Sequence, residues 1–190
     1  MNKNTKIYKI VLLGQYCVGK SSLIKMYCNK EFNEYTESTI GAAYFSKYVQ
    51  DKDIKLECWD TAGQERYNSL SLLYYKNSGA AIIMYDITNL ESFEKAKLWV
   101  DEIKNFNSKI YIAFVGNKSD LEDKREVSID EASSYASNND IFYIETSAKE
   151  DSNIDDLMEN ISNYISPDLS NNKSIEISQV MPQKKKICCF

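Results

Sequence analysis

The chain has 190 residues, of which 43% are hydrophobic and 27% charged, with a net charge of −5 and no histidine. This size suits one globular domain with a tail, and the acidic balance leaves no basic footprint for nucleic acid, so no nucleic-acid partner is expected. The lack of histidine excludes Ser-His and Cys-His catalysis and any His-ligated metal site.

The cysteines and the first residues of the chain indicate a compartment. The five cysteines are odd in number and form no C-x-x-C pair, and residues 1–10 lack the long apolar segment of a secretory leader. Residue 2 is asparagine, which excludes N-myristoylation, and no apolar run reaches the ~18 residues that a membrane-spanning helix needs. A reduced, intracellular setting is therefore expected.

The first third of the chain predicts a strand, a helix and a hairpin. YKIVLLG, at residues 8–14, has the pattern of a buried strand, and SSLIKMYCN, at 21–29, has helical spacing. Two strand-like runs follow, AAYFSKYVQ at 42–50 and IKLECWD at 54–60. The short polar break of residues 51–53 between them predicts an antiparallel hairpin.

Strands and helices alternate through the following residues. Strands are expected at 80–86, 110–116 and 141–145, and helices at 91–106, 128–137 and 153–165. This alternation predicts an α/β fold of three layers, in which about five helices cover a six-stranded, mostly parallel sheet with one antiparallel edge strand. In such sheets, ligands bind beyond the carboxyl ends of the strands.

A glycine-rich string joins the first strand to the first helix. GQYCVGKS, at residues 14–21, matches G-x-x-x-x-G-K-[ST], in which glycines let backbone N–H groups converge on phosphate oxygens. Lys20 is placed to reach the β- and γ-phosphates, and the Ser21 hydroxyl to bind magnesium. The alternative, an ordinary glycine-containing turn, is disfavoured because the string follows a strand and opens a helix. The candidate phosphate-contacting residues are Gly14, Cys17, Val18, Gly19, Lys20, Ser21 and Ser22.

Two strings at the ends of later strands indicate which base is bound. In NKSD, at 117–120, the Asp120 carboxylate can accept hydrogen bonds from the N1–H and the exocyclic amine of guanine, a donor pair that adenine lacks. In TSAK, at 146–149, the backbone N–H of Ala148 can meet the guanine O6. NKSD by itself is a common turn composition, and its place after a phosphate loop and before TSAK makes it specific. Lys118 can lay its stem over the base, and Asn117 can tie the loops together. The candidate nucleotide-binding residues in the two strings are Asn117, Lys118, Asp120, Ser147, Ala148 and Lys149.

With these motifs in this order, residues 6–166 resemble a Ras-superfamily small GTPase of the Rab branch. The resemblance implies a single phosphate-loop GTPase domain over residues 1–166, with GTP or GDP as ligand and Mg²⁺ as cofactor. It also implies that Phe32 packs edge-on against the guanine.

The resemblance further implies a switch with a hydrolytic site. In WDTAGQE, at 59–65, Asp60 is expected to hold magnesium through a water, Gly63 to offer its N–H to the γ-phosphate, and Gln64 to orient the attacking water. Thr39 is expected to complete the magnesium shell with Ser21 and to meet the γ-phosphate. The expected catalytic residues are Gln64, Lys20 and Thr39. Hydrolysis, slow without a helper protein, would then release both switch segments.

Three aromatic residues indicate which subgroup of the Rab branch the chain resembles. In Rabs, exposed aromatics near the switches contact effectors, and the matching residues are Tyr44, Trp59 and Tyr74. The strings STIGAAY and WDTAGQERYNSLSLLYYK are most similar to early-endosomal Rabs, although those proteins usually have phenylalanine where this chain has Tyr44. The alternative is that some of the three are core residues.

The last residues suggest a membrane anchor. Residues 167–183 are polar and rich in asparagine and serine, which is typical of a flexible linker, and KKKICCF follows at 184–190, so that 167–190 form a flexible tail. Cys188 and Cys189 are similar to the double-cysteine endings that Rabs use for two geranylgeranyl groups, and two lipid chains suffice for stable anchoring. A disordered tail with two free thiols is the alternative.

The implied setting is the cytoplasmic face of endosomal membranes in vesicular transport, with cycling through the cytosol. The implied partners are an exchange factor, a GTPase-activating protein, a GDP-dissociation inhibitor or escort protein, and effectors.

Tyr16 and Cys17 depart from the usual phosphate loop. Rabs usually have a small or polar residue where this chain has Tyr16, so we expect Tyr16 to lower assisted hydrolysis more than nucleotide binding. A nucleotide-locked scaffold with negligible turnover is therefore the alternative function. NKSD and TSAK disfavour a third interpretation, a phosphate-loop ATPase or kinase.

Overall fold

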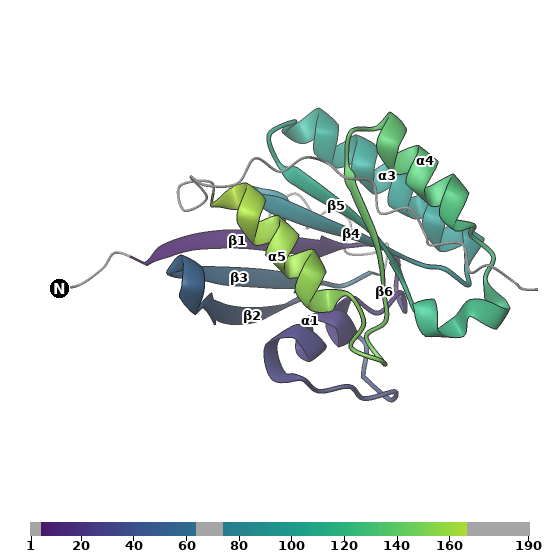
Figure 1. The fold of residues 1–190 in the computed structure, drawn as a ribbon, viewed down its shortest axis with the longest axis horizontal. Helices are drawn as coiled ribbons and strands as arrows, with labels where there is room; N and C mark the ends of the chain where they lie inside the picture. Colours follow the sequence, from purple (N-terminus) through teal and green to yellow (C-terminus); the bar gives the residue numbers. More distant parts are fainter. Residues whose placement is uncertain (1–4, 64–73, 167–190) are drawn as a thin grey trace, which may run out of the picture.

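The computed structural model describes residues 5–63 and 74–166. These residues form a six-stranded sheet in the order β2-β3-β1-β4-β5-β6, in which only β2 and β3 pair antiparallel (Figure 1). The strands are β1 Lys6–Leu13, β2 Ala42–Val49, β3 Ile54–Thr61, β4 Ala80–Asp86, β5 Tyr111–Asn117 and β6 Phe142–Thr146. The mostly parallel sheet and its antiparallel edge strand confirm the predicted fold class.

Four α-helices and two short 3-10 segments complete the described part of the chain. The α-helices are α1 Lys20–Asn29, α3 Leu90–Phe106, α4 Ile129–Asn138 and α5 Ile154–Ile165, and the 3-10 segments are η1 Gln50–Lys52 and η3 Ser119–Lys124. Asn89 caps α3 and Ser128 caps α4, each accepting a hydrogen bond from the backbone N–H three residues on. The polar break predicted as a hairpin turn is occupied by η1.

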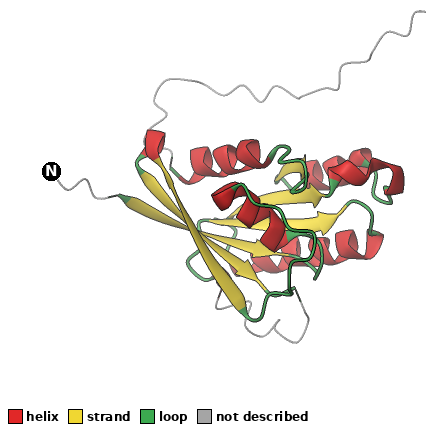
Figure 2. Cartoon of the chain, turned by 90° about the horizontal axis from the view of Figure 1, so that it is seen from below, coloured by secondary structure: helices red, strands yellow, loops and turns green. Residues whose placement is uncertain are grey.

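Two apolar layers lie on opposite faces of the sheet. Side chains alternate along a strand, so Ile10 and Leu12 of β1 pack with α1 and α5, whereas Val11 and Leu13 pack with α3 and α4. Figure 2 shows helices on both sides of the sheet. β4 is buried along its whole length, as expected for a central parallel strand. The three predicted layers are confirmed.

The loops that carry the predicted motifs meet at one edge of the sheet. β1, β3, β4, β5 and β6 run parallel, so their carboxyl ends share that edge.

None of the helices in the described ranges is long and apolar enough to cross a membrane. Gln64, Cys188 and Cys189 lie outside the described residues, as does the predicted tail.

Candidate functional site

The phosphate loop connects β1 to α1 through two glycines in conformations that side chains disfavour. Gly14 has φ +138° and Gly19 has φ +96°. A Cβ at Gly14 would collide with the carbonyl oxygen of Met84 in β4, and a Cβ at Gly19 would collide with the side-chain amide of Asn117 in β5. The glycines therefore let the loop lie against the ends of two neighbouring strands.

Lys20, the first residue of α1, points back into this loop. Its Nζ donates hydrogen bonds to the backbone oxygens of Gly14, at 2.9 Å, and Gln15, at 2.8 Å. The side chain is buried, and this burial lowers its pKa from 10.5 to about 8, although the charge of Asp60 opposes the shift. The ammonium has three donors, so it retains one for a phosphate oxygen.

Three oxygen-bearing side chains from distant segments converge beside Lys20. The Ser21 hydroxyl lies 2.8 Å from the Thr39 hydroxyl and donates to Asp60 Oδ2 at 2.5 Å, and Thr39 also donates to that oxygen at 3.1 Å. Burial raises the pKa of Asp60, and its Oδ1 has no hydrogen-bond partner among the described residues.

This oxygen cluster suits a hard cation. Mg²⁺ prefers oxygen ligands and is commonly held by one or two carboxylates together with substrate phosphates. In the described ranges, no group of three or more acidic, cysteine or histidine side chains could hold a metal. One carboxylate and two hydroxyls next to a phosphate loop fit Mg²⁺ bound together with a nucleotide, and the unpaired Asp60 oxygen fits a contact through water.

Asn117 joins the phosphate loop to the base-recognition strings. Its Nδ2 donates to the backbone oxygen of Val18 at 2.8 Å, and its Oδ1 accepts from the Thr146 hydroxyl at 3.2 Å. Asn117 and Thr146 are buried. The predicted role of Asn117 in tying loops together therefore has a geometric basis.

The two base-recognition strings contact each other directly. The Ser147 hydroxyl donates to Asp120 Oδ1 at 2.6 Å and accepts the backbone N–H of Glu150 at 3.1 Å. Lys118 has left-handed backbone, with φ +68°, and its ammonium lies 2.6 Å from Asp86 Oδ2 at the end of β4. Ser147 thus orients the carboxylate of Asp120, the group predicted to recognise guanine.

A cavity of about 390 Å³ brings the predicted residues together. Among the candidates, its lining includes Cys17, Gly19, Lys20, Ser21, Ser22, Phe32, Thr39, Gly63, Asn117, Lys118, Asp120, Ala148 and Lys149. Gly14, Val18, Asp60 and Ser147 are absent from the lining and instead hold lining residues in place through the contacts above. The catalytic role predicted for Gln64 stays a prediction.

One wall of this cavity is made of residues that were not predicted from the sequence. The missed lining residues are Asn33, Glu34, Thr36, Glu37, Ser38, Thr61 and Leu121. Five of them lie between Phe32 and Thr39, which are both predicted site residues, so the whole connecting segment could have been assigned to the site. Residues 33–37 match no motif, and Ser38, although it begins the string STIGAAY, has no role assigned from the sequence.

The aromatic trio forms one cluster outside the cavity. The rings of Tyr44 and Trp59 meet edge to face with centroids 5.6 Å apart, and those of Trp59 and Tyr74 lie 6.2 Å apart. Tyr44 is 47% exposed, whereas Trp59 and Tyr74 are half-buried. The Tyr44 hydroxyl donates to Glu57 at 2.8 Å and accepts from Lys55 at 3.2 Å. Tyr44 is therefore the most exposed ring of the trio, and it packs against the half-buried Trp59.

Comparison with known proteins places this site in a family. The sequence model of the Ras family matches residues 9–166. The chain is 51% identical over 159 residues to the "Ras-related protein RABF2a" of Arabidopsis thaliana, covering 82% of this chain and 79% of the relative. It is also 51% identical over 152 residues to the "Ras-related protein Rab5" of Nicotiana tabacum, covering 78% of this chain and 76% of the relative.

Proposed function

Because this chain belongs to the Ras family of small GTPases, we propose that it is a Rab-type GTP/GDP switch of endosomal membrane traffic with slow intrinsic turnover. Members of this family bind GTP and GDP with Mg²⁺ and hydrolyse GTP to GDP and phosphate. The names of the two relatives, RABF2a and Rab5, place both of them in the Rab branch, which supports the Rab part of this proposal.

One observation carries the proposal: a single cavity is lined both by Lys20 and Ser21 of the phosphate loop, here called its phosphate end, and by Asp120 and Ala148 of the base-recognition strings, here called its base end. A phosphate chain and a guanine base are the two parts of a nucleotide that these ends would recognise. Thr39 lines the same cavity and contacts Ser21 and Asp60. Loss of the γ-phosphate would therefore release the segment that carries Thr39 from the cavity.

The chemistry is positioning and charge stabilisation. The Lys20 ammonium, held by two backbone oxygens, would stabilise negative charge that develops on the phosphates. Ser21, Thr39 and Asp60 would hold magnesium, which when bound neutralises charge on the phosphate oxygens. Gln64, next to the cavity-lining Gly63, would orient the attacking water.

A single-turnover assay tests the hydrolytic part of this proposal. Protein loaded with GTP should convert it slowly to GDP, and Gln64→Leu should slow the conversion at least about tenfold, because the attacking water loses its orientation. Gln50→Leu, at the exposed hairpin turn, is a matched control that should hydrolyse at the wild-type rate. Equal rates for Gln64→Leu and wild type would contradict the proposed role.

We assign residues 1–166 to the GTP-binding domain and 167–190 to a tail prenylated on Cys188 and Cys189. The double cysteine after three lysines supports two lipid chains plus attraction to anionic lipid. Expressed in cells, the wild-type protein should fractionate with endosomal membranes, and the double Cys188→Ser, Cys189→Ser variant should be cytosolic. Membrane association of the double variant would contradict lipid anchoring. An exchange factor, a GTPase-activating protein, a GDP-dissociation inhibitor or escort protein, and effectors would act on the cycle of GTP binding, GTP hydrolysis and membrane attachment.

Tyr16 supports a second candidate function, a nucleotide-locked scaffold. Its side chain is 54% exposed and lines both the main cavity and a small cavity of about 90 Å³ beside the phosphate loop. A bulky phenol at this place would hinder entry of a helper's catalytic group more than binding of the nucleotide. The same single-turnover assay distinguishes the two functions, since the scaffold would release no phosphate.

A further inference from the structure

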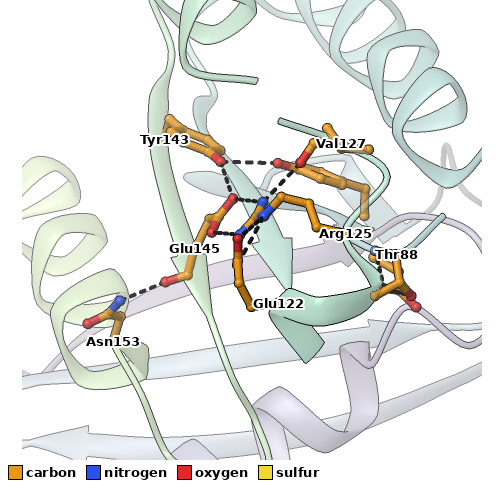
Figure 3. A network of polar contacts seen from close by, with 9 residues as sticks. Thr88, Glu122, Arg125, Val127, Tyr143, Glu145 and Asn153 are labelled. Carbon is orange, nitrogen blue, oxygen red and sulfur yellow. Dashed lines mark hydrogen bonds and ion pairs between the residues drawn. The ribbon is translucent and has the colours of Figure 1, made fainter. Parts of the chain in front are cut away.

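Arg125 lies behind the base-recognition strings and joins the two segments that carry them. It follows η3, which begins at Ser119 and contains Asp120, and it contacts Glu145, the residue before Thr146 in β6. Figure 3 shows the guanidinium between Glu122 of η3 and Glu145 of β6. One side chain therefore bridges the NKSD and TSAK strings from the side away from the cavity, since none of these three residues lines it.

The hydrogen bonds of Arg125 use every donor of its guanidinium. Nε donates to Glu122 at 2.9 and 3.0 Å, and Nη2 donates to Glu122 at 2.6 Å and to Glu145 at 2.8 Å. Nη1 donates to Glu145 at 2.8 Å and to the backbone oxygen of Val127 at 2.9 Å. These account for all five N–H groups, and a planar fork of this kind fixes the position of both carboxylates.

Burial indicates which of the two ion pairs of Arg125 contributes more to stability. The side chains of Arg125 and Glu145 are 13% and 14% exposed, whereas Glu122 is 65% exposed. Solvent screens the Glu122 pair, so it contributes less, while removing one partner of the Glu145 pair would leave a charge nearly buried without compensation. The hydrogen bonds that Arg125 donates to Glu145 and Glu122 raise its pKa, so the residue stays charged.

A second layer extends the network to the central strands. The Tyr143 hydroxyl donates to Glu145 at 2.7 Å and lies 3.2 Å from the Tyr85 hydroxyl of β4. Tyr85 lies against Gly116, the residue before Asn117, where an added Cβ would meet the phenol. Asn153, at the start of α5, donates to the backbone oxygen of Glu145 at 2.8 Å. Glu145 is therefore fixed on several sides.

We propose that Arg125, with Glu145 and Glu122, is a positioning residue that sets guanine selectivity and the lifetime of the bound nucleotide. It acts through the Asp120–Ser147 contact: the guanidinium fixes the spacing of η3 and β6, and that spacing orients the Asp120 carboxylate toward the base. This inference rests on the proposed binding of guanine nucleotide.

The test compares GDP with inosine diphosphate, which lacks the exocyclic amine that Asp120 is expected to accept. In the full-length protein, Arg125→Gln should release GDP about ten to a hundred times faster than wild type, because charged hydrogen bonds that order the base site are lost. The ratio of GDP to inosine diphosphate affinity should fall severalfold. Magnesium chelation should accelerate GDP release by the same factor in both proteins, since the phosphate end is unchanged.

Graded variants separate positioning from general damage. Glu145→Gln should change the GDP release rate and the base ratio as much as Arg125→Gln does. Glu122→Gln and Tyr143→Phe should change both quantities in the same direction but by less. Arg125→Lys should give values between those of wild type and Arg125→Gln, since lysine keeps the charge but has only three donors. Lys104→Gln is the control, because Lys104 also links two elements, α3 and the end of α4, but away from the cavity. It should leave both readouts at wild-type values.

The outcomes are distinguishable. Wild-type release rate and base selectivity in Arg125→Gln would overturn the positioning role, as would a change in rate with an unchanged base ratio. If Arg125→Gln does not fold, Glu122→Gln and Tyr143→Phe decide the question by the same ratio. Wild-type protein that binds neither diphosphate would overturn the proposed function and this inference together.

Discussion

The two ends of the cavity are built by different means. At the phosphate end, one continuous loop supplies the glycine backbone and the buried Lys20, and its conformation is set by contacts to the ends of β4 and β5. Thr39 and Asp60 join Ser21 there from other segments. At the base end, residues 117–120 and 146–149 lie at the ends of two different strands, β5 and β6. They are held together by side chains, through Asp120–Ser147, Asn117–Thr146 and Arg125–Glu145.

This difference predicts how each end responds to change. A backbone cradle tolerates most side-chain substitutions but depends on Lys20 and on the close approach at its glycines. An end made of paired side chains loses selectivity gradually as each pair is removed. The two ends touch where Gly19 meets Asn117, so a change there should affect both.

The largest effect is expected from Lys20→Ala. Loss of a buried ammonium that contacts the phosphates should weaken GTP binding at least about a hundredfold, while whatever binding remains should keep its preference for guanine over adenine. Isothermal titration with GTP and ATP measures both quantities. Lys109→Ala, in an exposed turn before β5, is the control expected to bind like wild type. Tight GTP binding by Lys20→Ala would mean that the loop is not the phosphate site.

Gly19→Ala should break the contact between the two ends. Its left-handed backbone and the clash with Asn117 should lower the free energy of unfolding by about 1–3 kcal/mol and impair nucleotide binding. Gly79→Ala is the matched control, because a Cβ there meets Ile165 at an ordinary 3.6 Å. Thermal unfolding with and without GDP measures the effect. Equal stability of the two variants would contradict the close approach at Gly19.

Tyr16→Ser should sharpen the comparison within the phosphate end. We expect hydrolysis stimulated by a Rab-activating protein to rise about tenfold, because the catalytic group gains access, while GDP affinity stays unchanged. Tyr164→Ser is a suitable control, since Tyr164 is similarly exposed, at 57%, and lies on α5 away from the cavity. Identical rates for Tyr16→Ser and wild type, with and without the activator, would show that the phenol is harmless.

The smallest effect is expected from Tyr44→Phe, outside both ends. Its hydroxyl contacts Glu57 and Lys55 in a solvent-exposed cluster, so its loss should change the free energy of unfolding by less than about 1 kcal/mol. GDP dissociation should stay at the wild-type rate. A tenfold change in that rate would show that the aromatic trio is coupled to the cavity, contrary to the separation described above.

Sequence alone predicted most of the fold because the strands are short apolar runs bounded by polar turns, and their alternation with helices leaves few topologies. It also predicted the phosphate loop, NKSD and TSAK, since each is a contiguous string. The convergence of Ser21, Thr39 and Asp60 was expected from the family resemblance, and in the structure the Ser21 hydroxyl lies within hydrogen-bond distance of the other two side chains.

What sequence could not supply were pairings between distant segments. Arg125 reads as a surface charge in a polar stretch, and only the register of β6 beside β5 brings Glu145 to it. Residues 33–37, in the wall between Phe32 and Thr39, likewise have no periodicity or motif, and their place at the cavity depends on how the chain crosses from α1 to β2.

The most direct test of the central claim, a cavity that selects guanine nucleotide by two separate ends, is competition for bound labelled GDP. GTP should displace the label at stoichiometric concentrations, and ATP should fail at about a thousandfold excess, because Asp120 finds no donor pair on adenine. If ATP displaces GDP as well as GTP does, the base end does not select guanine and the account is wrong.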